Sequence, residues 1–209
     1  PQTVNAYFSP TKNEIVFPAA YLQPPNFNPK ADDAVNYGAI GVTIGHEISH
    51  AFDDKGSQFD GDGNLRNWWT KEDRDNFDKR TGLLANQYSQ YEVLPGRKLN
   101  GELTLGENIA DLGGAKAAFR AYKISLKGEP SPIIDNYTGE QRFFIGTAQS
   151  DRVKFRDEIY EMRVATSVHS PSRFRVDGVI INMKEFHKAF STEKGDKLYK
   201  SDNDIILIW

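Results

Sequence analysis

Short apolar runs mark the beginning of the chain. Residues 5–22 hold two β-prone runs on either side of a polar, turn-like segment, "SPTKN". Two such runs around a turn favour an antiparallel hairpin. A Pro- and Asn-rich segment, 23–33, follows and ends in aspartates, which are suited to capping a helix. The pattern therefore predicts a hairpin, then a loop, then the start of a helix.

The helix predicted next covers residues 34–53. At about 100° per residue its apolar side chains gather on one face, which we expect to be turned toward the core. These side chains are Ile44, Ile48 and Phe52. Glycines at 38, 41 and 45 lie in the same segment. Because glycine is a poor helix former, packing against the rest of the protein has to hold this helix.

Further helices are predicted from helix-start signals and from apolar spacing. Thr70 with Asp73 resembles a capping box and begins a helix that carries Phe77, Leu84, Tyr88 and Tyr91 at helical spacing. A helix from about 106 to 125 is rich in alanine and glycine, which permits close approach of another helix. Helices are also predicted at 139–164, opened by Thr138 with Gln141, and at 183–190. The runs "VII" (179–181) and "IILIW" (205–209) are typical of strands.

Composition narrows the classes of function. The 209 residues are 38% hydrophobic and 26% charged, which is ordinary for a globular domain. The net charge is −3 and no basic run stands out, so we expect no nucleic acid partner. No apolar stretch approaches the roughly 20 residues that span a bilayer, so we expect no membrane contact from this segment. The chain begins without an initiator methionine or a signal peptide, and we expect it to be a piece of a longer protein.

The segment "IGHEISHAFDD" (44–54) carries the first candidate chemistry. His46 and His50 are four residues apart on the predicted helix, so both imidazoles can reach one metal ion. Glu47 is offset from them and is suited to take a proton from metal-activated water. Asp53, one turn further, is placed to hold the second ring nitrogen of His50. The alternative is a solvent-exposed helix with fortuitous histidines, because HExxH alone has many false positives.

A catalytic metal site needs a third protein ligand. The chain has no cysteine, so the ligands must be His, Asp or Glu. The segment "TLGENIADLGG" (104–114) offers Glu107 as that ligand and Asp111, four residues later, as the partner of His46. Acidic residues also favour helix starts for electrostatic reasons, and this is the alternative for Glu107 alone. Together with HExxH, the pattern predicts a site for one Zn²⁺ with an open fourth position.

Several longer segments resemble the neprilysin family of zinc peptidases, which includes endothelin-converting enzymes and bacterial oligopeptidase O. They are "VNAYFSP", "NEIVFPAAYLQPP", "ADDAVNYGAIGVTIGHEISHAFDD", "GNLRNWW", "NGELTLGENIADLGG", "HSPSRFRVDGVIINMKEF" and the terminal "IW". They extend from the first residues to the last. The resemblance implies an α+β fold: a thermolysin-like zincin catalytic lobe, predominantly helical, with a small mixed sheet at the edge of the cleft.

The resemblance also implies a function. Residues 1–209 would be the C-terminal catalytic domain of a zinc endopeptidase acting on oligopeptides, and a preceding N-terminal helical portion would restrict the cleft to short peptides. The family expectation is a bulky apolar residue after the scissile bond. A catalytically inactive zinc-binding or scaffolding domain of the same fold is the alternative. The intact Glu47 argues against it, because a purely structural site has no use for a base.

Further roles are implied by matching positions. Asn5 and Ala6, in "NAY", would pair with the substrate backbone as an added strand. His169 and Arg175, in "HSPSRFR", would serve the tetrahedral intermediate and a substrate carbonyl, with a protonated His169 as the donor. His187 has no motif around it, and we expect a structural role for it.

The chain also departs from the family pattern. Family members usually carry a tryptophan in the stretch that matches "TAQSDRVKFRDE", where this chain has Asp151. Since this position lies outside the zinc motifs, we expect it to affect local packing rather than chemistry. Animal ectoenzymes of the family rely on disulfides, which this cysteine-free chain lacks. We therefore expect a bacterial protein of the cell envelope, periplasm or extracellular space, with the cytoplasm as the alternative.

Overall fold

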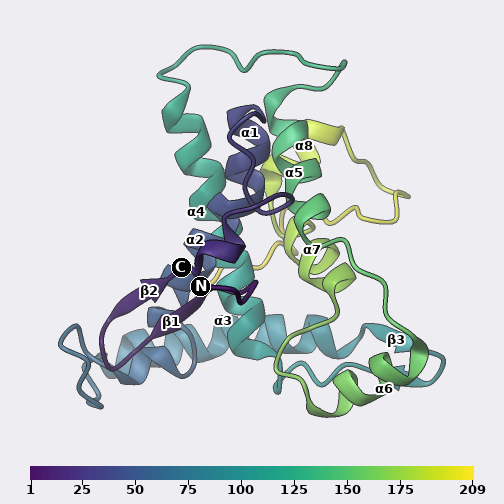
Figure 1. Ribbon diagram of the computed structural model, residues 1–209. Helices are drawn as coiled ribbons and strands as arrows, with labels where there is room; N and C mark the ends of the chain where they lie inside the picture. Colours follow the sequence, from purple (N-terminus) through teal and green to yellow (C-terminus); the bar gives the residue numbers. More distant parts are fainter.

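The computed structural model describes all residues, 1–209, and is mainly helical (Figure 1). The α-helices are α1 (Asp33–Asn36), α2 (Val42–Ser49), α3 (Lys71–Ser89), α4 (Leu105–Ser125), α5 (Gly139–Ser150), α6 (Asp157–Thr166), α7 (Ser172–Ile180) and α8 (Lys184–Phe190). Short 3-10 turns are η1 (Ala19–Tyr21), η3 (His50–Phe52) and η4 (Gly56–Gln58), and η2 (Tyr37–Gly41) is a π-helical turn. None of the helices combines the length and apolar character needed to span a bilayer.

The strands form two separate antiparallel pairs. The predicted hairpin is present as β1 (Tyr7–Ser9) and β2 (Glu14–Val16), with Tyr7 opposite Val16. A second pair, β3 (Glu92–Leu94) and β4 (Arg97–Lys98), lies between α3 and α4, where no strand was predicted. The small sheet expected at the cleft edge is thus the β1–β2 hairpin, and it is antiparallel rather than mixed.

Helix α4 runs through the middle of the molecule, and α3 lies across one of its ends (Figure 1). Residues from α3, α4, α5, α7 and α8 share one apolar core. In that core the rings of Phe119 and Phe143 lie edge to face, and the buried Tyr88 hydroxyl donates to the carbonyl oxygen of Phe174. This core fixes α4, the helix that carries Glu107 and Asp111.

Helix α2 packs along α4 through small residues. A Cβ added to Gly45 would lie only 2.7 Å from the carbonyl oxygen of Gly114, so the two backbones approach closely at this point. The predicted small-residue surface of α4 is therefore confirmed as a helix–helix contact. Its partner is the helix that carries HExxH.

The predicted orientation of this helix was wrong. The face expected to be in the core is exposed: Ile44, Ile48 and Phe52 keep 39%, 50% and 44% of their surface. The buried face is instead centred on His46 and includes Gly45 and Ser49. Close packing against α4 needs small side chains, and this requirement outweighs the burial of the larger apolar ones. The predicted single helix 34–53 is also divided into α1, η2, α2 and η3.

Other predictions were correct at helix starts and wrong at some ends. Thr70 caps α3, and Thr138 with Gln141 forms a complete capping box on α5. The helix predicted for 139–164 is two helices, because α5 stops at Ser150 and α6 begins at Asp157. The prediction missed this break because the sequence carries a signal for the start of the helix but none for its end. "VII" begins inside α7 and is not a strand. In "IILIW", Ile206 and Ile208 are buried like alternate strand residues, but no neighbouring strand pairs with them.

A matched pair of glycine substitutions tests the contact between α2 and α4. Gly45→Ala is expected to lower the free energy of unfolding by about 1–3 kcal/mol, because the new methyl group overlaps the α4 backbone. A Cβ added to Gly82 in α3 would meet no atom within 4 Å, so Gly82→Ala should instead raise the free energy of unfolding by about 0.4–1 kcal/mol. Chemical denaturation of both variants measures these changes. Equal effects of the two substitutions would contradict the close contact.

Candidate metal centre and active site

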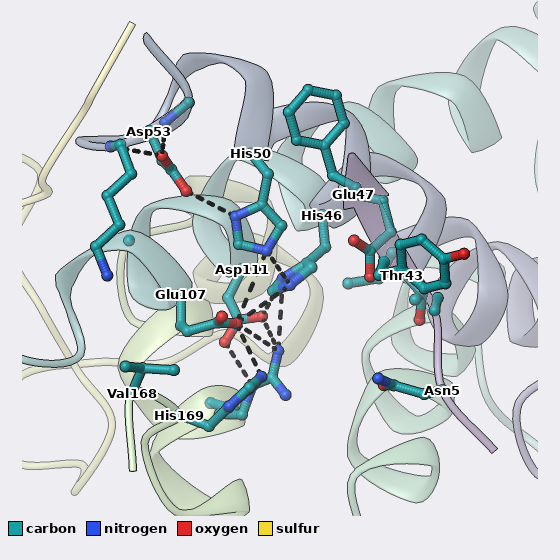
Figure 2. Close-up of a pocket in the computed structure, with 18 of the residues that line it drawn as sticks. Asn5, Thr43, His46, Glu47, His50, Asp53, Glu107, Asp111, Val168 and His169 are labelled. Atoms are coloured by element: carbon teal, nitrogen blue, oxygen red, sulfur yellow. Dashed lines mark hydrogen bonds and ion pairs between the residues drawn. The ribbon is translucent and has the colours of Figure 1, made fainter. Parts of the chain in front are cut away.

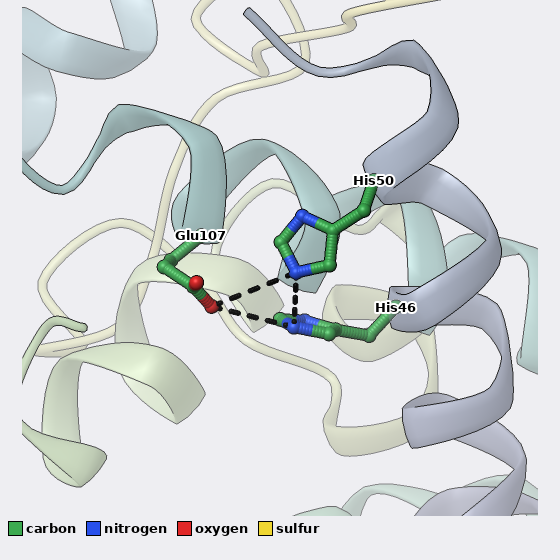
Figure 3. Close-up of side chains that lie close together, drawn as sticks. All are labelled: His46, His50 and Glu107. Carbon is green, nitrogen blue, oxygen red and sulfur yellow. Dashed lines mark hydrogen bonds and ion pairs between the residues drawn. The ribbon is translucent and has the colours of Figure 1, made fainter. Parts of the chain in front are cut away.

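Three potential ligands converge where α2 meets α4 (Figure 3). His46 lies in α2, His50 begins η3, and Glu107 lies in the first turn of α4. The Nε2 atoms of the two histidines are 3.0 Å apart. Glu107 Oε2 is 3.3 Å from Nε2 of His46 and 3.9 Å from Nε2 of His50. The three residues predicted as ligands are therefore brought together.

Each histidine is held by a carboxylate through its other nitrogen. His46 Nδ1 is 2.7 Å from Asp111 Oδ1, and His50 Nδ1 is 2.7 Å from Asp53 Oδ2. Asp53 lies just beyond the helix, where its Oδ1 accepts backbone N–H bonds from Lys55 and Gly56. With Nδ1–H donated to a carboxylate, each neutral imidazole directs the lone pair of Nε2 toward Glu107.

The donor set fits a zinc ion. Two ligands of a tetrahedral ion with bonds of about 2.0–2.1 Å lie about 3.3–3.4 Å apart, close to the observed separations. Glu107 Oε2 is buried and has no hydrogen-bond partner in the protein. Two lone pairs and a carboxylate oxygen repel one another unless a cation lies between them. Burial disfavours the imidazolium of His46, but Asp111 and Glu107 raise its pKa to about 9, so without a metal ion a proton on this ring would offset the nearby negative charge.

Arg175 is bound to the same carboxylate as His46. Its Nε donates to Asp111 Oδ2 at 2.8 Å and its Nη2 donates to Oδ1 at 2.6 Å. Burial opposes ionisation of Asp111, but Arg175 and His46 hold the pKa of its carboxyl below the usual range. Nη1 of Arg175 makes no hydrogen bond within the protein. The arginine thus fixes Asp111 and still has donors free toward the cavity that it lines.

Glu47 lies beside the metal group but takes no part in it. It is only 5% exposed, lines the cavity and is not among the three clustered ligands. Burial raises the pKa of its carboxyl, while the neighbouring His46 and His50 lower it to a smaller extent. A carboxylate with a raised pKa next to a metal group is suited to accept and return a proton.

His169 approaches Glu107 from the loop before α7, with its Nε2 3.2 Å from Oε2 of Glu107. Burial lowers the pKa of His169, although the charge of Glu107 opposes that shift. The expectation that this histidine is protonated in the reaction therefore stays a prediction. A neutral imidazole retains one N–H donor.

A cavity of about 440 Å³ connects these groups. Asn5 and Ala6 lie on its wall, directly before β1, and their backbone groups make no hydrogen bonds to the protein backbone. Figure 2 shows Glu47, Thr43 and Asn5 on one side of the histidine pair, and His169 with Val168 on the other. The cavity therefore has two ends that meet at the metal group.

Sequence reasoning missed part of the cavity wall. Asp151, expected to affect packing only, lines the cavity, as do Tyr21 and Thr43. Tyr21 and Thr43 lie in segments that resemble the family, but no role was predicted for either, and no motif marks Asp151. The available signal was that Asp151 stands where family members usually carry a tryptophan. His187, by contrast, lies outside the cavity, bound to the Thr192 hydroxyl and the Ile181 carbonyl, so its structural role is confirmed.

Comparison with known proteins agrees with this geometry. The model of peptidase family M13 matches residues 5–206. The chain belongs to peptidase family M13. The M13 chain is 45% identical to Neprilysin-3 of Drosophila melanogaster over 202 residues and 47% identical to human endothelin-converting enzyme 1 over 201 residues. The resemblance to the neprilysin family is confirmed.

Solved structures show the same fold for the M13 chain. The zinc metalloprotease ZMP1 of Mycobacterium tuberculosis, in complex with an inhibitor, is 50% identical and superposes with a TM-score of 0.96 over 99% of the chain. PepO of Lactobacillus rhamnosis is 37% identical, with a TM-score of 0.88 over 98% of the chain. These neighbours confirm a predominantly helical zincin lobe.

The M13 chain is shorter than its relatives. It covers 26% of the length of each of the two curated proteins, while 95% of the chain itself is matched. It covers 32% of the ZMP1 chain. Relatives come from animals as well as bacteria, so a bacterial origin stays a prediction.

Proposed function

We propose that this chain is the catalytic part of a zinc-dependent endopeptidase that hydrolyses oligopeptides. The observation that carries the proposal is the convergence of His46, His50 and Glu107 on one point, with Glu47 beside them and outside the ligand set. A purely structural zinc site closes its fourth position with another protein ligand. Here the fourth side faces a cavity large enough for a peptide segment.

Bound zinc would supply Lewis acidity, which polarises the scissile carbonyl and lowers the pKa of the attacking water. Glu47 takes a proton from that water and delivers it to the leaving amine. Its raised pKa suits both steps, since the carboxyl must hold the proton between them. Asp53 and Asp111 keep the imidazoles in the tautomer that leaves Nε2 free.

The remaining cavity groups bind the substrate. The unpaired backbone of Asn5 and Ala6 is available for an extended peptide to add beside β1. Arg175 directs its free Nη1 to a substrate carbonyl, and His169 donates an N–H to the oxyanion. By analogy with the longer relatives, a preceding N-terminal portion of the same protein limits access to short peptides. Its presence and a location in the cell envelope or outside the cell stay predictions.

Peptide cleavage by the full-length protein tests the proposal. Hydrolysis of short peptides should occur, stop with a zinc chelator and return when zinc is added back. Stoichiometric zinc binding without cleavage of any peptide would favour the inactive scaffold instead. Cleavage that persists at full rate in the chelator would exclude metal-dependent hydrolysis.

Asp111→Asn is expected to reduce zinc affinity or activity by about 10- to 100-fold, the usual effect of removing a carboxylate partner from a ligating histidine. An asparagine can present its N–H₂ group to His46 in place of an acceptor oxygen. The substitution also removes the ion pair between residue 111 and Arg175. Competition with a fluorescent chelator measures the affinity. Asp75→Asn, at an exposed position of α3, is the control. Unchanged affinity and activity would show that Asp111 does not orient the ligand.

A further inference from the structure

Asp151 brings an unpaired carboxylate to the cavity wall. It follows the last residue of α5 and caps that helix through its backbone N–H only. Its carboxylate accepts no hydrogen bond from another residue and has no cation within ion-pair distance. A largely buried carboxylate normally has such a partner. Since Asp151 faces the cavity, a ligand can supply the missing one.

The positive charge of Arg175 is directed mainly to Asp111 and does not form an ion pair with Asp151. Arg175 is the cation whose field reaches Asp151, but its Nε and Nη2 both donate to Asp111. Burial raises the pKa of Asp151 to about 6, and Arg175 limits that rise. The carboxyl is therefore mainly ionised at neutral pH. Glu47 adds a second acidic group to the cavity, so a cationic ligand group would meet favourable charge there.

Asp151 lies at the Glu47 end of the cavity. The Tyr21 hydroxyl is 2.9 Å from the Thr43 hydroxyl, and Thr43 lies with Glu47 on one side of the histidine pair (Figure 2). Thr147, one turn before Asp151, donates its hydroxyl to the carbonyl oxygen of Gly38 in η2, so α5 ends beside the turn that leads into α2 and Thr43. His169 and Val168 occupy the opposite side (Figure 2).

The proposed chemistry assigns this end to one part of the substrate. Glu47 gives its proton to the leaving amine, and the residue on the carboxyl side of the scissile bond carries that amine. A side chain of this residue that extends past Glu47 would enter the part of the cavity lined by Tyr21 and Asp151. Ala39 and Val42 line the same cavity and offer apolar surface for a long methylene stem.

We propose that Asp151 selects peptides with a lysine or arginine directly after the scissile bond, by pairing with the cationic end of that side chain. This inference rests on the proposed peptidase function and names its substrate class. It differs from the apolar preference expected from the family resemblance.

Cleavage of matched peptides by the zinc-loaded full-length protein tests the proposal. The peptides are identical except for Lys, Arg, Leu or Glu after the scissile bond. We expect the highest kcat/KM with Lys or Arg and the lowest with Glu. Asp151→Asn should lower kcat/KM for the Lys and Arg peptides by about 10- to 100-fold, the range for loss of a charge-assisted hydrogen bond, and leave the Leu peptide nearly unchanged. Asp157→Asn, in exposed α6, is the matched control.

Binding gives a second measurement that does not depend on turnover. In the Glu47→Gln background, calorimetry with the same peptides should give a lower Kd for Lys than for Leu, and Asp151→Asn should remove that difference. A preference of the unsubstituted protein for Leu would overturn the inference. So would an equal loss of Lys and Leu binding in Asp151→Asn. If no peptide is cleaved although Lys peptides bind selectively, the peptidase proposal fails and the assignment of Asp151 stands.

Discussion

Glu47→Gln is expected to lower kcat by about 10²- to 10⁴-fold, the range attributed to a positioned general acid–base. Glutamine has nearly the same shape as glutamate but cannot accept the proton of the attacking water or return it to the leaving amine. Zinc content should stay near one ion per chain, because Glu47 is not among the clustered ligands. Steady-state peptide hydrolysis and elemental analysis of the same preparation measure the two quantities.

The control for this substitution is Glu185→Gln at an exposed position of α8, which should retain full activity. Circular dichroism of both variants shows whether the fold is intact. Full activity of Glu47→Gln would reject the assignment of the base. Loss of zinc together with activity would show instead that Glu47 supports the metal, which contradicts its position outside the ligand group.

Glu107→Ala is expected to weaken zinc binding by more than about 100-fold, beyond the effect of losing a group that only orients a ligand. The substitution leaves two imidazoles, an incomplete set for a protein zinc site. Zinc per chain after dialysis against a chelator measures the loss. Glu102→Ala, an exposed carboxylate in the turn before α4, should keep its zinc under the same conditions. Retention of zinc by Glu107→Ala would exclude Glu107 as the third ligand.

The zinc ligands could be predicted because their spacing carries geometric information. Residues four apart on a helix lie on one face, and this holds for His46 with His50 and for Glu107 with Asp111. Asp53 was predicted through the same helical geometry, although the helix ends before it and Asp53 reaches His50 from extended backbone. The contact between His50 and Asp53 forms even though the helix has ended, because residues only three apart in the sequence stay close in space.

The environment of each helix could not be predicted in the same way. A helical pattern shows which residues share a face, but it does not show which face has a neighbour. In α2 the side that carries Gly45 packs on α4, and Ile48 on the other side stays exposed. The position of Asp151 depends equally on tertiary structure, since α5 ends at the cavity only through its packing against α1 and η2.

The glycines of α2 and α4 bear on how this centre can be redesigned. Gly114 would place a Cβ 2.8 Å from the Val42 carbonyl oxygen, so neither backbone leaves room for an ordinary side chain. The separation of Glu107 from the two imidazoles is thus set by direct contact between the backbones of α2 and α4. Grafting HExxH alone onto a host helix would transfer two donors without the spacing that brings in the third. The smallest portable unit is the crossed helix pair with its glycines.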